Sequence, residues 1–125
     1  MSPRIIHPDD SSFEAEVLER SREIPVLVDF WAPWCQPCLV LGPPLEEVAG
    51  EFSGRLVLAK VDIDEHQRLA GRYRVRGIPD VRAFVDGREV DAFTGALPES
   101  EIRTFVAGLP APGSANAWPG ARDGD

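Results

Sequence analysis

Residues 26–38 read V-L-V-D-F-W-A-P-W-C-Q-P-C, an apolar run that leads directly into the two cysteines of the chain. A near-continuous run of β-branched and aromatic residues is the pattern of a strand buried on both faces. After the cysteines, apolar residues recur at helical spacing to about residue 52. Cys35 and Cys38 are therefore expected at the point where a buried strand gives way to a helix.

Strand and helix patterns alternate along the rest of the chain. Apolar, β-branched runs predict strands at 5–6, 26–31, 56–64, 81–85 and 88–93. Helical spacing and terminal signals predict helices over about 10–22, 39–52, 65–73 and 98–108. This order predicts an α/β fold, with a mixed sheet covered by helices on both faces.

Proline and glycine residues refine this outline. Pro43 and Pro44 fall inside a predicted helix, where each removes a backbone donor, and they predict a kink. The dipeptide at 86–87, Asp-Gly, is a strong signal for a hairpin turn. Residues 109–125 are rich in Pro, Ala and Gly, so we expect one domain over 1–108 followed by a flexible tail or linker.

The charge balance narrows the class of partner. Thirteen basic against 21 acidic residues give a formal net charge of −8, which argues against nucleic acid or an anionic membrane surface. No apolar stretch approaches the ~20 residues that span a bilayer, and the first residues do not resemble a signal peptide. We therefore expect a cytoplasmic protein, in whose reducing surroundings a close cysteine pair is more often catalytic or metal-binding than structural.

The spacing of Cys35 and Cys38 leaves three interpretations open. The two thiols could form a redox pair, supply half of a metal site, or fill a helix as inert buried groups. A zinc site would need two more ligands, and the available histidines, His7 and His66, show no ligand-like pattern. The strand-to-helix junction and the neighbouring tryptophans favour the redox pair.

Two charged residues stand inside apolar strands. Asp29 lies in the middle of V-L-V-D-F-W, where burial is costly unless the carboxylate is paired and where its pKa should rise. Lys60, the one lysine among 13 basic residues, lies within L-V-L-A-K-V. We expect the two to pair across neighbouring strands; the alternative is that each extends its polar end toward solvent.

Several motifs together resemble the thioredoxin family over about residues 4–108. They are W-A-P-W-C-Q-P-C after a buried strand, G-I-P-D at 77–80, Asp29, Pro43, Lys60, and glycines at 87 and 95. The resemblance implies a central five-stranded sheet of order 1-3-2-4-5 with four flanking helices. It also implies a thiol–disulfide oxidoreductase whose redox group is the cysteine pair itself, with no cofactor and no metal.

The resemblance assigns roles to the catalytic residues. Cys35 would attack the substrate disulfide, because a helix start favours the thiolate that performs the attack. Cys38, one turn later and expected to be the more buried of the two, would resolve the mixed disulfide. Asp29 would lie behind Cys38 and help move its proton, with Lys60 as its partner.

The same resemblance implies a shallow groove for an extended substrate segment. Pro79 would be a cis-proline facing the cysteines, and Ile78 before it would offer backbone groups to the substrate, as in strand addition. The groove would further include Trp34, Gln36, Pro37 and Gly95. The implied partners are protein disulfides and a thioredoxin reductase, with chaperones as further partners, and a monomer is expected.

Four residues depart from the ordinary thioredoxin pattern. Gln36 replaces a glycine, Leu39 a basic residue, Asp80 a threonine, and Arg74 a glycine or small polar residue. Leu39 and Asp80 together should disfavour the Cys35 thiolate and repel acidic partners. The stretch from 78 to 100 also resembles the thioredoxin domain of bacterial chaperone–redox proteins, so a domain that binds or protects oxidised or unfolded clients, with little general reductase turnover, is the alternative function.

Gln36 yields the first prediction. A glutamine between the cysteines favours the helix and adds an amide near the sulfur, so Gln36→Gly should shift the equilibrium of the pair with glutathione. A tenfold change corresponds to about 30 mV, roughly the free energy of one hydrogen bond to a charged group. An unshifted potential in Gln36→Gly would make Gln36 a neutral substitution.

Overall fold

The computed structural model describes residues 2–113, and its centre is a mixed five-stranded sheet of order β1-β3-β2-β4-β5. The strands are β1 (Arg4–Ile6), β2 (Val26–Trp31), β3 (Val57–Asp62), β4 (Asp80–Val85) and β5 (Arg88–Thr94). The first three strands run parallel, whereas β4 and β5 are antiparallel to their neighbours. The predicted order of strands is confirmed.

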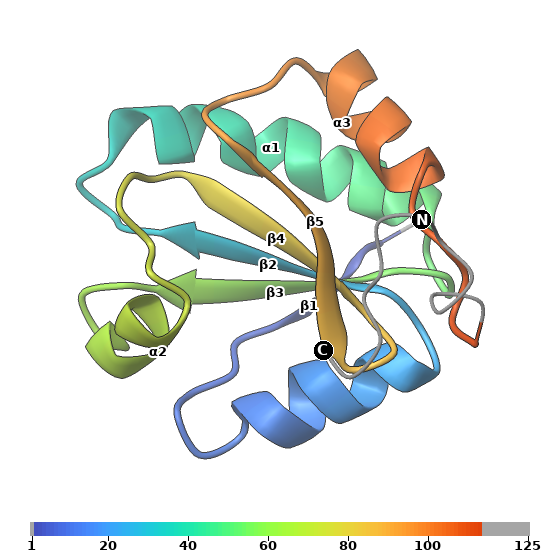
Figure 1. Ribbon diagram of the computed structural model, residues 1–125. Coiled ribbons are helices and arrows are strands. Elements are labelled where there is room, and N and C mark those ends of the chain that lie inside the picture. The colour runs from blue at the N-terminus through green and yellow to red at the C-terminus, as the bar shows by residue number, and fades with distance from the viewer. Residues whose placement is uncertain (1, 114–125) are drawn as a thin grey trace.

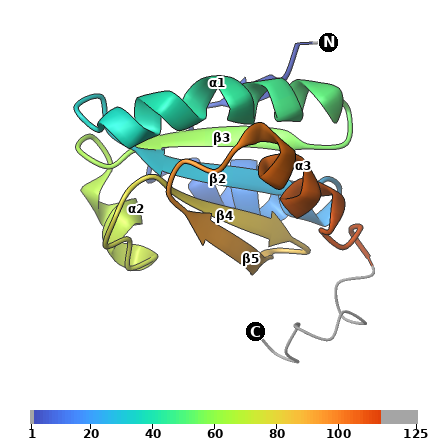
Figure 2. The same cartoon turned by 90° about the horizontal axis from the view of Figure 1, so that it is seen from above.

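Helical segments cover both faces of this sheet (Figures 1 and 2). They are η1 (Glu14–Glu19), η2 (Arg20–Arg22), α1 (Gln36–Glu51), α2 (Gln67–Arg72) and α3 (Glu99–Ala107). In Figure 1, α1 and α3 lie above the sheet, whereas the blue helical segment η1–η2 and the short α2 lie below it. With η1 and η2 counted as one continuous segment, the thioredoxin fold with four helices is confirmed.

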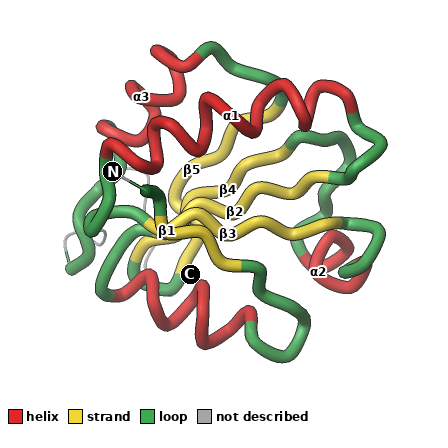
Figure 3. Tube along the Cα trace, turned by 180° about the vertical axis from the view of Figure 1, so that it is seen from behind, coloured by secondary structure: helices red, strands yellow, loops and turns green. Residues whose placement is uncertain are grey.

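Side-chain alternation along the central strands divides the core into two layers. Leu27 of β2 and Leu58 of β3 belong to the cluster that includes α1 and α3. Val28 and Phe30 of β2 belong to the other cluster, together with Phe13 before η1. Successive residues of a strand point to opposite faces, so a strand apolar on both faces needs a helix layer on each. Figure 3 shows the sheet between these layers from behind.

Helix α1 continues through Pro43 and Pro44. The helix is therefore not broken at these prolines, and the kink expected there stays a prediction. The donors they lack would have bonded the carbonyl groups four residues earlier, at Leu39 and Val40. Both of those residues are exposed, so water can satisfy their carbonyl groups while the buried face of the helix stays continuous.

The hairpin between β4 and β5 turns at Asp86 and Gly87, as predicted. Both residues have positive φ, 56° and 81°, which is the requirement of a two-residue type I′ turn. Ser21 of η2 fixes this turn, since its hydroxyl accepts the Gly87 N–H at 2.8 Å and its carbonyl accepts the Asp86 N–H at 2.8 Å. The first helical segment is thus tied to the far end of the sheet.

The C-terminal stretch is only partly described. Residues 109–113 follow α3 along the body of the domain, and the Gly113 N–H donates to the Asp86 carboxylate at 2.9 Å. The remainder of the predicted tail, 114–125, lies outside the described residues. Among residues 2–113, no helix has the length and apolar character needed to cross a bilayer.

Candidate active site

Cys35 lies at the junction of β2 and α1 and caps the helix. Its backbone is extended, with φ −88° and ψ 105°, and its Sγ accepts the Cys38 N–H at 3.2 Å. A disulfide joins Cys35 to Cys38, whose Cα atoms are 5.2 Å apart. The first N–H groups of a helix have no intrahelical acceptor, so this position favours negative charge on the Cys35 sulfur when the disulfide opens.

The two cysteines are equally buried, at 4% exposure each. The prediction that Cys38 is the more buried residue is therefore wrong in this disulfide form. Cys35 is covered on one side by the loop before β4, where the Ile78 carbonyl oxygen lies 3.8 Å from its Sγ. Trp31, Ile63 and Ile78 pack around the pair.

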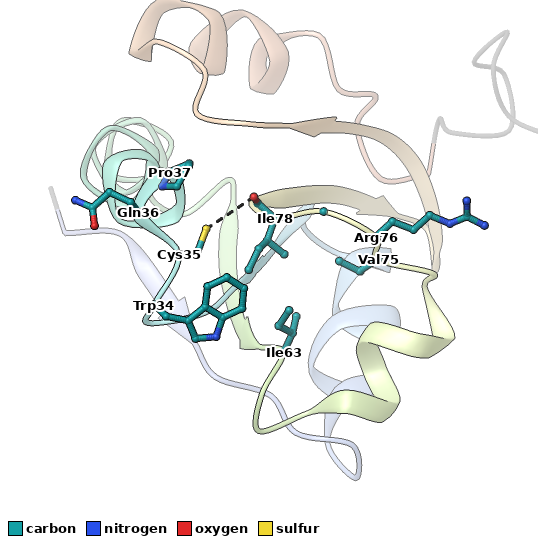
Figure 4. A pocket seen from close by; sticks show the side chains of 9 residues that line it. Trp34, Cys35, Gln36, Pro37, Ile63, Val75, Arg76 and Ile78 are labelled. Carbon is teal, nitrogen blue, oxygen red and sulfur yellow. Dashed lines mark hydrogen bonds between the residues drawn. The ribbon is translucent and has the colours of Figure 1, made fainter.

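An open pocket of about 410 Å³ lies directly beside the Cys35 sulfur (Figure 4). Residues from the β2–α1 junction, the end of β3 and the loop before β4 line it: Trp34, Cys35, Gln36, Pro37, Ile63, Val75, Arg76, Gly77 and Ile78. In Figure 4 the Trp34 ring and Ile63 lie on one side of the sulfur, and the Ile78 carbonyl points at it from another. The pocket therefore brings a mostly apolar surface to a redox sulfur.

The predicted substrate residues fall into two groups. Trp34, Gln36, Pro37 and Ile78 line the pocket. Pro79 and Gly95 are not among its lining residues, but they join each other nearby, because the Gly95 N–H donates to the Pro79 carbonyl at 2.9 Å. The Ile78–Pro79 peptide bond is cis, as the resemblance implied, and this turn exposes the Ile78 carbonyl to Cys35.

Asp64 is a site residue that the sequence analysis missed. The Trp34 indole Nε1–H donates to its carboxylate at 2.7 Å, although the Trp34 ring is 66% exposed. Asp64 in turn donates its N–H to Asp62 at 2.9 Å. The sequence held a signal for this contact, the D-I-D stretch at the end of β3. Parallel strands end at the same edge of a sheet, so this stretch lies beside the residues that follow β2.

Asp29 and Lys60 are neighbours across β2 and β3, but they do not form the predicted ion pair. The strand register aligns the two residues. The Lys60 ammonium contacts Glu46 of α1 at 3.3 Å, and within the described chain Asp29 Oδ1 has no hydrogen-bond partner. The prediction is wrong because α1 offers Lys60 a second carboxylate, nearer to solvent, which strand patterns do not reveal.

The environment of Asp29 favours its protonated form. Burial raises the pKa of Asp29 from 3.8 to about 6, Lys60 opposes this rise, and Glu46 and Asp80 add to it. The side chain is 1% exposed. A carboxyl group with a pKa close to neutral is suited to accept and return a proton at physiological pH.

Asp80, which follows the cis-proline, is paired with Arg82 of the same strand. Arg82 donates from Nε and Nη2 to both of its carboxylate oxygens, at 2.7 and 2.9 Å. Arg82 also donates to Glu89 at 2.9 Å. One guanidinium is thus shared by two carboxylates, and Asp80 still adds to the raised pKa of Asp29. The expected effect of Asp80 on the Cys35 thiolate stays a prediction.

The cysteine pair has no further metal ligands gathered around it in the described part of the chain. Across residues 2–113, no group of three or more His, Cys, Asp or Glu side chains comes together in a way that could hold a metal ion. The geometry instead combines a disulfide at a helix start, an open apolar pocket and a buried carboxyl group near neutrality. This set supports reversible exchange between a dithiol and a disulfide.

Comparisons with known proteins give the same result. Residues 4–108 match the family model described as thioredoxin. Thioredoxin 2 of Chlorobaculum tepidum is 42% identical over 102 residues, covering 82% of this chain and 92% of that protein. Thioredoxin of Pseudomonas aeruginosa is 43% identical over 106 residues, covering 85% and 96%. Thioredoxin 1 of Synechococcus elongatus is 45% identical over 93 residues, covering 74% and 85%.

The raised pKa of Asp29 predicts a pH-dependent stability difference. Ionisation is harder in the folded chain than in the unfolded one, so stability is lost as pH rises from 3.8 toward about 6. The loss approaches about 3 kcal/mol above pH 7, from 1.36 kcal/mol per pKa unit. Asp29→Asn removes this cost, so it should be more stable than wild type by up to that amount at pH 7 and about equal near pH 3.5.

Denaturant unfolding at the two pH values measures this difference. Asp91→Asn, on the exposed part of β5, is the matched control and should show no such gain at pH 7. Equal stability of Asp29→Asn and wild type at pH 7 would contradict the buried, unpaired state of this carboxyl group.

Proposed function

The chain belongs to the thioredoxin family and is a thiol–disulfide oxidoreductase with a Cys35–Cys38 redox pair, and on this premise we propose a role for each residue of the site. Cys35 is the attacking residue and Cys38 the resolving one. Asp29 is the proton acceptor for Cys38, and Lys60 modulates its charge. The observation that supports these roles most directly is the position of the Cys35–Cys38 disulfide. It lies at the start of α1, beside an open pocket and the Ile78 carbonyl.

The reaction proceeds in two exchanges. The Cys35 thiolate attacks one sulfur of the substrate disulfide, a mixed disulfide forms, and the other substrate sulfur leaves as a thiolate. Cys38 then loses its proton to Asp29, and its thiolate attacks the Cys35 sulfur. The bond between Cys35 and the substrate breaks, the Cys35–Cys38 disulfide forms, and the second substrate sulfur leaves. The substrate gains two electrons, the dithiol loses two, and two protons end on the substrate thiols.

The pocket supports an extended polypeptide substrate. The Ile78 carbonyl lies beside the sulfur and can accept a backbone N–H from a substrate segment, as in strand addition. Trp34 offers an exposed ring, held by Asp64, against which an apolar substrate side chain can pack. Gln36 and Pro37 border the pocket on the α1 side, and Pro79 and Gly95 support the loop that presents Ile78.

We further propose the setting in which the protein works. Its substrates are protein disulfides, and a thioredoxin reductase returns the pair to the dithiol. Turnover requires repeated reduction, which fits a reducing compartment such as the cytoplasm. A monomer suits this role, because both the sulfur and its pocket come from one chain.

A second candidate is a client-binding redox domain of the chaperone–redox type. It is favoured by the exposed apolar residues next to the cysteines in the sequence, with Trp34 66%, Leu39 47% and Val40 59% exposed. Apolar side chains exposed together mark binding surfaces for unfolded or apolar segments. In this function the cysteines trap or protect a client, and chaperones are the partners.

Insulin reduction with NADPH and a thioredoxin reductase distinguishes the two. We expect multiple turnovers for the wild type, none for Cys35→Ser, and trapped mixed disulfides for Cys38→Ser. Turnover of this kind supports the reductase. No turnover, together with Cys35-dependent mixed disulfides and suppressed aggregation of an unfolded client, would support the second function.

The role of Asp29 has its own test. Asp29→Asn removes the acceptor without changing side-chain volume, so the resolving step should slow by roughly 10²-fold or more, the usual contribution of a general base. Stopped-flow single turnover should then show formation of the mixed disulfide at the wild-type rate and a delayed release of the second thiol. An unchanged release rate would remove Asp29 from the mechanism.

A further inference from the structure

One face of α1 carries three residues in a column behind the redox pair. Cys38, Gly42 and Glu46 are spaced four residues apart, so they lie one above another on the same side of the helix. This is the side that faces the sheet, since Cys38 and Gly42 are buried and Leu41 and Leu45 beside them belong to the core. Glu46 is at the outer end of the column, with its side chain 40% exposed.

The Lys60 ammonium lies opposite this column. It contacts Glu46 Oε2 at 3.3 Å and lies 5.2 Å from the centre of the Trp31 ring. A Cβ atom at Gly42 would come within 3.9 Å of Lys60 Nζ, which places the ammonium against the helix backbone at this glycine. Lys60 is therefore held on the α1 side, between the end of the column and an aromatic ring.

Asp29 does not form an ion pair with Lys60, although the two residues are neighbours across β2 and β3. It is aligned with Lys60 in the β2–β3 register, yet Oδ1 has no partner among the described residues. The charged groups that act on it come from three elements: Lys60 on β3, Glu46 on α1 and Asp80 on β4. Asp80 is already paired with Arg82, so Lys60 and Glu46 are the two groups whose arrangement can change its charge state.

We propose that Glu46 is a positioning residue that holds the Lys60 ammonium away from Asp29, so that Asp29 remains a proton acceptor for Cys38. The inference rests on the proposed role of Asp29 and adds a residue that does not touch the sulfurs. Without Glu46, the lysine can turn to Asp29, with which it is aligned in the β2–β3 register. A direct ion pair would keep Asp29 ionised and make it a weaker base.

Two effects of Glu46 act in the same direction. Its own negative charge disfavours a second negative charge on Asp29, and its contact with Lys60 removes a positive charge from the Asp29 carboxylate. Glu46→Gln cancels both effects at nearly constant side-chain size. The titration of Asp29 should then move to lower pH by about one unit, the lower end of the range for a newly formed contact with an opposite charge.

Carbon-13 NMR of the Asp29 carboxyl group in the full-length oxidised protein measures this directly. The cysteines are joined in that form and do not titrate, so the Asp29 midpoint is read without interference. Glu47→Gln is the matched control, because it removes the same charge from the next, exposed position of α1. We expect a fall of about one pH unit in Glu46→Gln and no change in Glu47→Gln. An unchanged midpoint in Glu46→Gln, or an equal fall in both variants, overturns the proposal.

A second comparison tests whether Lys60 carries the effect. In a Lys60→Gln background, Glu46→Gln should lower the Asp29 midpoint by clearly less than it does in the wild type, because only the direct charge effect remains. Glu46→Asp keeps a carboxylate on α1 and should restore most of the wild-type midpoint. An equal fall with and without Lys60 would overturn the positioning role.

The pH profile of the resolving step gives a readout that a general loss of structure would not produce. With a lower Asp29 midpoint, Glu46→Gln should release product faster than the wild type near pH 5, where more Asp29 is ionised. Above pH 7, where Asp29 is ionised in both proteins, Glu46→Gln should release product more slowly than the wild type because its Asp29 is a weaker base. If the rate follows half of the one-unit fall in pKa, the decrease is roughly threefold. A parallel loss at all pH values contradicts the proposal. If Asp29→Asn leaves the rate unchanged, the proposed role of Asp29 fails, while the NMR result still reports whether Glu46 controls its charge.

Discussion

Leu41 and Leu45 of α1 pack in one cluster with Leu27 of β2, and this contact lays the helix across the parallel strands. Each fully buried leucine contributes about 1.5–3 kcal/mol, so the position of α1 is firmly determined. Because the helix starts directly after β2, its first turn falls at the end of the strand. Cys35 is at that start, and its sulfur therefore meets the unpaired N–H groups of the helix. The chemistry of the cysteine pair follows from how the core packs.

The same packing explains why Asp29 is buried. It lies two residues after Leu27 on β2, so strand alternation turns both side chains toward α1. Burial without a partner costs about 3 kcal/mol at neutral pH, judged from its raised pKa. An asparagine there would not carry this ionisation cost. A residue that lowers stability while lying in the layer behind the redox pair is typical of a functional site.

Much of the fold was predictable from the sequence, because the strands are apolar runs and the turn at Asp86 and Gly87 needs positive φ at both residues. The arrangement around Asp29 was not. Strand pairing placed Lys60 opposite Asp29 correctly, but the partner of Lys60 is Glu46, a residue of another layer. Whether Lys60 pairs with Asp29 or with Glu46 depends on the distance between α1 and the sheet, and side-chain packing sets this distance. Helix α1 likewise runs on through Pro43 and Pro44, from Gln36 to Glu51.

The effect of each departure from the ordinary thioredoxin pattern depends on the contacts of the new side chain, and its formal charge alone does not predict it. Both carboxylate oxygens of Asp80 accept hydrogen bonds from Arg82, which also pairs with Glu89. Leu39 has no such compensation, and it is 47% exposed beside the cysteines. Val40 next to it is 59% exposed, and Trp34, which lines the pocket, is 66% exposed. The surface that Trp34, Ile63 and Ile78 bring to the Cys35 sulfur is therefore apolar, and it is set by the same packing that places the cysteines at the start of α1.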